Sequence, residues 1–436
     1  MPAASPYLPP TLRDTSAIAN GVALTRDPLG FFTRLNREAG GFAHYVLSDG
    51  IMYFVNDPEL VRRILIKHEP DFDKWAFNES FRQIFGTGLI GSHGETHRKS
   101  RKVAQPPLQP AHLSGLAEMI VRLTNEHLRA WPEGEVDLTH EMSLLTIEVI
   151  GHTLFGISLG KRNNRIHEAT MTMLRLSTKF GGAPRETTEF RAANEDLTLI
   201  TQELMDEAIA RDDDAGLFAV LRAGEIPPPQ LREEIRTFLL AGHVTTAQTL
   251  ACACWLMCRH PEVRQAWHNE VDQVLAGRCP DWDDIRRLPL CEMVLLETLR
   301  LYPPVWVFGR EALNEVEFEG ALLHRGDKLV ICPWLLHRNP EHFPEPEKFD
   351  PSRWRDDARS RLPRGNYLPF STGARSCLGE HFAMMESILV LACLAQHWNL
   401  AELPDQPDPG WSAHLLYWPR RGIHLQATPR NPFAHD

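Results

Sequence analysis

The amino-acid sequence predicts a mainly α-helical protein with small β-sheets. Residues 230–260 form a segment of roughly thirty residues, longer than a typical globular helix, in which only Gly242 is a weak point. The second half of this segment is apolar on nearly every side, which predicts a buried helix that crosses the molecule. The next segment, 261–277, begins with a proline, repeats apolar residues at helical spacing and stops at a glycine. Runs with strand composition are short and lie towards the two ends of the chain.

The first of these runs lies near the N-terminus, where two β-rich stretches flank Asp49-Gly50, a strong signal for a two-residue hairpin. Segments 315–320, 327–332 and 414–426 also have the composition of short strands. No internal repeat and no glycine- or serine-rich linker divides the chain. The sequence therefore predicts one domain over residues 1–436, with a flexible N-terminal segment of about 15 residues.

Composition narrows the possible functions. The chain has 436 residues, of which 43% are hydrophobic and 24% charged, as in ordinary globular proteins. A formal net charge of −11 argues against a nucleic-acid-binding protein, which usually carries a basic surplus. The start of the chain resembles neither a signal peptide nor a membrane anchor, and the eight cysteines do not form a disulfide pattern. We expect a cytoplasmic, monomeric protein with reduced thiols.

Cys377 lies in an unusual local environment. It follows Arg375, lies between Gly373 and Gly379, and precedes a predicted helix of about twenty residues. A helix N-terminus and a nearby arginine favour a thiolate, and the glycines allow close approach of a flat group. A single soft anionic ligand of this kind suits axial ligation of a haem iron. A buried structural cysteine is the alternative that these residues alone leave open.

Residues 370–379 match the F-x-x-G-x-R-x-C-x-G signature of the cytochrome P450 family, so the chain resembles that family. Further matches follow the family's order: Glu297 and Arg300 fit its E-x-x-R pattern, and Arg353 stands where the family has a third member of the charge cluster. The resemblance extends from about residue 28 to the C-terminal strands. It implies the cytochrome P450 fold, with the long helix over the haem.

The resemblance also implies a cofactor, haem b, with Cys377 as the iron ligand. Phe370 would pack near the sulfur and limit the access of water, and Gly379 belongs to the same loop. The residues expected to contact the haem propionates are His97, Arg101, Arg310 and Arg375. Cys252, Cys254 and Cys258 are expected to pack in the core.

The segment Ala241 to Thr246 falls where the family has A/G-G-x-D/E-T-T. The resemblance makes Gly242, Thr245 and Thr246 catalytic candidates, with the Thr245 alcohol beside the oxygen site. Val244 replaces the family's acid. Protons would then come from His243, Thr246, ordered water or the substrate, or the enzyme carries out a reaction other than routine hydroxylation.

By the same resemblance, the substrate pocket is apolar and aromatic. Its expected residues are Phe77, Phe85, Leu89, Leu240, Ala241, Val305, Val307 and Leu416, together with Trp75, Phe81, Val244, Trp306, Phe308, His414, Leu415 and Tyr417. A lipophilic small molecule such as a terpenoid, polyketide or fatty acid is the expected substrate.

Two functions from different classes are compatible with these residues. The first is a haem-thiolate monooxygenase fed by a separate ferredoxin and an NAD(P)H-dependent ferredoxin reductase. Arg98, Lys99 and Lys102 are either surface charge or the patch on which an acidic electron donor docks. The second is a non-catalytic haem-thiolate protein that binds a ligand or partner, for which the missing acid at Val244 is the only indication. The Thr245 alcohol favours the first.

Overall fold

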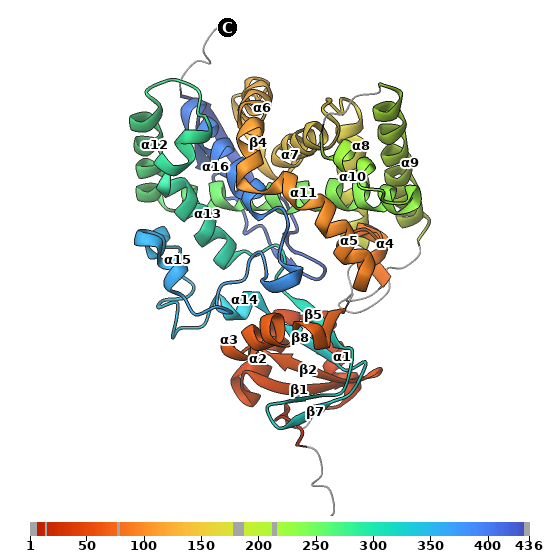
Figure 1. Cartoon of the computed structure of the whole chain (residues 1–436). Coiled ribbons are helices and arrows are strands. Elements are labelled where there is room, and N and C mark those ends of the chain that lie inside the picture. Colours follow the sequence, from red (N-terminus) through yellow and green to blue (C-terminus); the bar gives the residue numbers. More distant parts are fainter. Residues whose placement is uncertain (1–6, 14, 76–78, 178–186, 212–215, 431–436) are drawn as a thin grey trace, which may run out of the picture.

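A computed structural model describes residues 7–13, 15–75, 79–177, 187–211 and 216–430; for residues 79–81 it describes the backbone only. Figure 1 shows that most helices gather in one part of the molecule, while the largest sheet lies at the other end with α1 and α2 beside it. The prediction of a mainly helical fold with small sheets is confirmed. None of the helices in the described part of the chain is both long enough and apolar enough to span a membrane.

The helices of the described chain are α1 (Ala17–Arg26), α2 (Pro28–Ala39), α3 (Pro58–Arg62), α4 (Glu79–Phe85), α5 (Gly94–Ala104), α6 (Pro110–Arg129), α7 (Leu138–Phe155), α8 (Arg162–Leu176), α9 (Thr188–Ala210), α10 (Gly216–Ala223), α11 (Pro228–Arg259), α12 (Pro261–Leu275), α13 (Pro289–Leu301), α14 (Pro333–Leu336), α15 (Ala358–Arg361) and α16 (Glu380–His397). The strands are β1 (Phe42–Leu47), β2 (Gly50–Val55), β3 (Phe72–Trp75), β4 (Gly134–Asp137), β5 (Phe308–Ala312), β6 (Val316–Phe318), β7 (Ala321–Leu323), β8 (Lys328–Ile331), β9 (Trp398–Glu402), β10 (Trp411–Ala413), β11 (Tyr417–Pro419) and β12 (His424–Pro429).

The largest sheet has the strand order β1-β2-β8-β5-β3. Its first two strands form the predicted hairpin, although the turn lies one residue earlier than Asp49-Gly50. Leu47 pairs with Gly50, so Ser48 and Asp49 make the turn and Gly50 opens the second strand with a φ of 124°. Only glycine adopts that φ without strain. The far edge of the sheet, β3 with β5, carries side chains towards the functional site.

The predicted long helix is α11, which crosses the helical part of the molecule in Figure 1. It begins directly after Pro227, and nearly all of its side chains from Leu239 onwards are buried. At Gly242 a β-carbon would lie 2.7 Å from Cδ1 of Ile150 on α7. Glycine therefore lets these two helices approach closely at the middle of α11, next to the site.

Candidate active site

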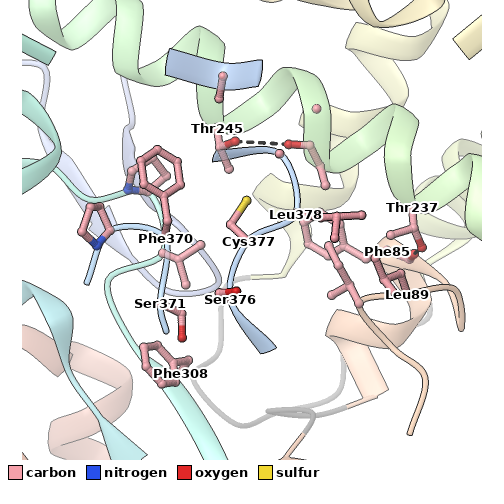
Figure 2. Close-up of a pocket in the computed structure, with 18 of the residues that line it drawn as sticks. Phe85, Leu89, Thr237, Thr245, Phe308, Phe370, Ser371, Ser376, Cys377 and Leu378 are labelled. Carbon is pink, nitrogen blue, oxygen red and sulfur yellow. Dashed lines mark hydrogen bonds between the residues drawn. The ribbon is translucent and has the colours of Figure 1, made fainter. Parts of the chain in front are cut away.

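A cavity of about 350 Å³ lies between α11, the loop that precedes α16, and the edge formed by β3 and β5. In Figure 2, Cys377 and Thr245 face the same space from opposite sides, with Phe370 to one side of the sulfur. Most other lining residues are apolar. The cavity thus places one thiol and one helix-borne alcohol around a largely apolar interior.

The Cys377 loop turns tightly before α16. The Cys377 backbone N–H donates to the Phe370 carbonyl at 2.8 Å, and the helix begins three residues later at Glu380. The side chain is exposed to the cavity, but protein separates it from bulk water, and this burial raises the pKa of the Cys377 thiol to about 11. Burial thus outweighs the Gly379 backbone N–H and the nearby Arg101, which both lower that pKa. A backbone N–H and a nearby arginine thus favour the thiolate as expected, burial opposes them, and metal coordination deprotonates such a thiol.

The two glycines of the loop have different roles. Gly373 has a φ of 76°, and a β-carbon there would lie 2.1 Å from the Leu65 carbonyl oxygen, so only glycine lets the loop pass this backbone. A β-carbon at Gly379 would meet no described atom within 4 Å. Gly379 therefore borders open space in the cavity.

Three arginines and a histidine converge on one end of the cavity; burial, and then Arg375 and Arg101, lower the pKa of His97 to about 4, so its ring is neutral there. His97 and Arg101 lie one turn apart on α5, Arg310 comes from β5, and Arg375 comes from the Cys377 loop. The Arg101 guanidinium donates to the Ser376 carbonyl at 2.8 Å, which ties α5 to the loop. All four residues expected to contact propionates therefore line the same cavity.

The electrostatics at this end are unbalanced. Arg375 pairs with Asp73 and donates to the Ser92 carbonyl at 2.9 Å, so Arg101 rather than Arg375 is the cation that acts on the thiol. Burial and then Arg375 lower the pKa of Arg310 to about 10. Burial, Arg310 and Arg375 lower the pKa of Lys74 to about 7. No aspartate or glutamate is among the described residues that line the cavity, so this end can accept an anionic group.

One face of α11 forms a wall of the cavity. Its lining residues recur mainly at spacings of three and four: Thr237, Phe238, Ala241, Gly242, Thr245, Thr246 and Thr249. The Thr245 hydroxyl donates to the Ala241 carbonyl at 3.1 Å (Figure 2). Leu240 and Val244 do not line the cavity, although both were expected to. Both side chains are buried outside the cavity lining, with exposed fractions of 0% and 2%.

The remaining pocket predictions divide into three groups. Those that line the cavity are Phe85, Leu89, Val305, Val307 and Leu416, with Trp75, Phe308, His414 and Leu415. Trp306 and Tyr417 do not line it, because both pack in the core beside the large sheet. Phe77 lies outside the described residues, and the Phe81 side chain is not described.

The structure adds lining residues that sequence reasoning missed: Lys74, Leu108, Ile150, Thr153, Ser177, Leu217, Thr237 and Phe238. A signal existed for two of them. Thr237 and Phe238 lie eight and seven residues before Thr245, and such positions share a helix face. The others come from elements whose contact with α11 is set by tertiary packing.

Glu297, Arg300 and Arg353 meet in one cluster away from the cavity. The Arg300 Nε and Nη2 atoms each donate to a Glu297 carboxylate oxygen at 2.9 Å, and Arg353 Nε donates at 3.0 Å. Glu297 and Arg300 side chains are 0% exposed, and that of Arg353 is 14% exposed. Trp354 Nε1 also donates to Glu297, at 2.9 Å. These bonds join α13 to the segment 350–354.

A mainly helical fold with a thiol and an alcohol around one apolar cavity is the architecture of haem-thiolate oxidoreductases. The family model "Cytochrome P450" matches residues 9–426, and the chain belongs to this family. Its members bind haem through a cysteine thiolate, act on hydrophobic substrates and take electrons from redox partners. The protein is therefore an oxidoreductase.

Three relatives come from Streptomyces. Cyclooctatin synthase of Streptomyces melanosporofaciens is 32% identical over 421 residues, covering 90% of both chains. Cyclooctat-9-en-7-ol 5-monooxygenase of the same organism is 31% identical and covers 89% of this chain and 88% of the relative. Pentalenene oxygenase of Streptomyces avermitilis is 29% identical and covers 94% of both chains.

The residues present fit a haem. A single thiol is exposed to the cavity, Gly379 borders open space, and the cationic end lacks any described lining carboxylate. The two propionates of a haem would supply the missing negative charge to Arg101, Arg310 and Arg375 and could accept a hydrogen bond from His97.

Proposed function

We propose that the protein is a monooxygenase that holds haem b through Cys377 and oxidises a terpenoid. The observation that carries the proposal is the placement of Cys377 and Thr245 in one apolar cavity. The names of the Streptomyces relatives supply the substrate class: cyclooctatin synthase, cyclooctat-9-en-7-ol 5-monooxygenase and pentalenene oxygenase. Such lipophilic substrates match the apolar lining.

The haem would supply dioxygen activation; the chain supplies position, charge and protons. The Cys377 sulfur would donate electron density to the iron, while Phe370 shields the sulfur from water. Arg101, Arg310 and Arg375 would fix the propionates by charge and His97 by a hydrogen bond, and the apolar walls would exclude bulk water from the substrate. The Thr245 hydroxyl, now bonded to the Ala241 carbonyl, would turn to hold a proton donor at the oxygen site.

Electrons would arrive from a ferredoxin and its NAD(P)H-dependent reductase. Arg98, Lys99 and Lys102 are exposed on α5, the helix that also carries His97 and Arg101 into the cavity. An acidic donor docked there would lie close to the haem edge. The decisive experiment supplies surrogate ferredoxin and reductase and measures oxygen consumption against product with terpenoid substrates. Haem and substrate binding without turnover would favour the non-catalytic alternative that Val244 raises.

Thr245→Ala is expected to lower the product formed per NAD(P)H oxidised roughly tenfold or more, because general acid catalysis usually contributes at least that much. Hydrogen peroxide should account for the lost electrons. Two variants serve as controls and should keep nearly the wild-type ratio of product to NAD(P)H oxidised. They are Thr245→Ser, which keeps the hydroxyl, and Thr249→Ala, one turn along the same helix face. An unchanged ratio for Thr245→Ala with the native substrate would show that Thr245 delivers no protons.

Val244→Asp tests the missing acid. Val244 does not line the cavity, so a carboxylate there would act through water or neighbouring groups rather than by touching the substrate. By that route we expect improved coupling on poor substrates, together with lower thermal stability because the group is buried. The control is Val244→Asn, because asparagine has the size of aspartate but no acidic group. It should lower stability without improving coupling. Equal coupling in both variants would mean that an acid at this position has no role here.

The two loop glycines should respond differently to alanine. Gly373→Ala places a β-carbon against the Leu65 carbonyl and should lower the thermal midpoint and the haem content together. In Gly379→Ala the new β-carbon contacts no protein atom, so the fold should persist. A haem bound in that space would contact the methyl group, so haem affinity should fall. Circular dichroism and haem titration of both variants separate the two effects. Full haem affinity in Gly379→Ala would place the cofactor elsewhere.

A further inference from the structure

Several hydroxyl groups in the cavity already have hydrogen-bond acceptors. The hydroxyls of four described threonines and one serine each donate to a carbonyl of the backbone, at 2.8 to 3.1 Å: Thr153, Ser177, Thr237, Thr245 and Thr249. Each can therefore only accept a further hydrogen bond in this arrangement.

His414 differs from these hydroxyls. It lies in the connection between β10 and β11 and lines the cavity. Its Nδ1 atom is buried and has no hydrogen-bond partner among the described residues. Because Nδ1 is inaccessible and no described residue hydrogen-bonds Nε2, Nε2 is the ring nitrogen left for a ligand in the cavity. Burial, and then Arg420, lower the pKa of His414, which leaves the ring neutral at pH 7.

The connection that carries His414 is held firmly in place. Trp306 Nε1 donates to the His414 carbonyl at 3.0 Å, and the Tyr417 N–H donates to the Pro304 carbonyl at 2.9 Å. The side-chain amide of Gln248 on α11 donates to the Tyr417 carbonyl. These bonds fix the backbone that carries His414, so a ligand that binds there need not order this connection.

We propose that Nε2 of His414 hydrogen-bonds a hydroxyl group of the substrate, so that the enzyme takes a lipophilic alcohol in preference to the parent hydrocarbon. A hydroxyl both donates and accepts, and so it satisfies Nε2 in either neutral tautomer. The inference rests on the proposed function and extends it: an earlier step must install the hydroxyl, either an oxygenation or a cyclisation that ends with capture of water.

The test uses matched pairs of terpenes, each a hydrocarbon and its positional alcohols on the same skeleton. Dissociation constants come from spectral titration and calorimetry of the haem-loaded protein. We expect at least one alcohol to bind wild type roughly tenfold more tightly than its parent, the value of a hydrogen bond of about 1.4 kcal/mol. His414→Phe should lose that preference, whereas His414→Gln should keep part of it. Leu416→Val, which lines the cavity without a polar group, should weaken both ligands alike.

The outcomes separate the inference from the proposed function. If no alcohol binds more tightly than its hydrocarbon, or if His414→Phe keeps the wild-type preference, the assignment of His414 is wrong even when turnover is observed. Absence of thiolate-ligated haem or of NAD(P)H-dependent oxidation overturns the proposed function instead. Calorimetric binding of the alcohols still tests His414 in that case.

Discussion

Cys377→Ser is expected to abolish the red-shifted Soret band that the reduced, carbon-monoxide-bound wild-type protein should show. That shift reports an anionic sulfur ligand, and a serine hydroxyl is a much weaker donor to iron. Because the thiol opens into a cavity with a cationic end, haem can still enter the variant, so the spectrum tests ligation rather than folding. The measurement is the reduced carbon-monoxide difference spectrum of equal amounts of folded protein, checked by circular dichroism.

Cys393→Ser and Cys252→Ser are the controls for this experiment. Cys393 lies on α16, the helix that follows the Cys377 loop, and Cys252 lies on α11; both side chains are 0% exposed. Burial raises the pKa of both thiols, so neither is a thiolate at neutral pH. Both variants should keep the red-shifted band. An unshifted band in the wild type, as from histidine ligation, would contradict the assignment of Cys377.

Local sequence patterns predicted the elements that carry the site, but not which faces meet. Proline at the start and apolar side chains throughout predicted α11, and the glycine-flanked cysteine predicted the loop before α16. The orientation of α11 was harder to predict, because Leu240, Val244 and Thr245 lie close in sequence but only Thr245 lines the cavity. Projecting the segment as a helix from Thr245 would have excluded Leu240, roughly 140° away, but not Val244, which lies about 100° from Thr245, as does the lining residue Thr246.

The pairing of the charged residues at the cationic end of the cavity could not be predicted from the sequence. Arg375 pairs with Asp73, which lies 302 residues earlier, and this pair removes Arg375 from the thiol. Lys74 follows Asp73 on β3, and the same contact between β3 and the Cys377 loop brings it to the cationic end. No local pattern relates β3 to the Cys377 loop, because their contact depends on how the sheet edge packs against the helical part. The pKa of the Cys377 thiol likewise depends on its burial by the surrounding elements, which the sequence does not show.

Arg300→Ala is expected to destabilise the fold by about 3 to 5 kcal/mol, because it leaves the buried Glu297 carboxylate without its principal partner. The loss extends beyond one ion pair: Arg300 also donates to the carbonyls of His337 and Lys348, both at 3.0 Å. The segment that carries Arg353 would lose its attachment to α13. Soluble yield, haem content and urea unfolding of the variant should all fall, with folding failing before chemistry does.

The chain offers a matched control with the same spacing. Glu59 and Arg62 on α3 also form an E-x-x-R pair, with a salt bridge of 2.5 Å, but their side chains are 60% and 35% exposed. Water already solvates both charges, so Arg62→Ala should leave the unfolding midpoint nearly unchanged. Arg300→Lys, which keeps the charge but cannot reproduce the two bonds to Glu297, should fall between the two alanine variants. Equal unfolding midpoints for Arg300→Ala and Arg62→Ala would mean that burial of the cluster adds nothing to stability.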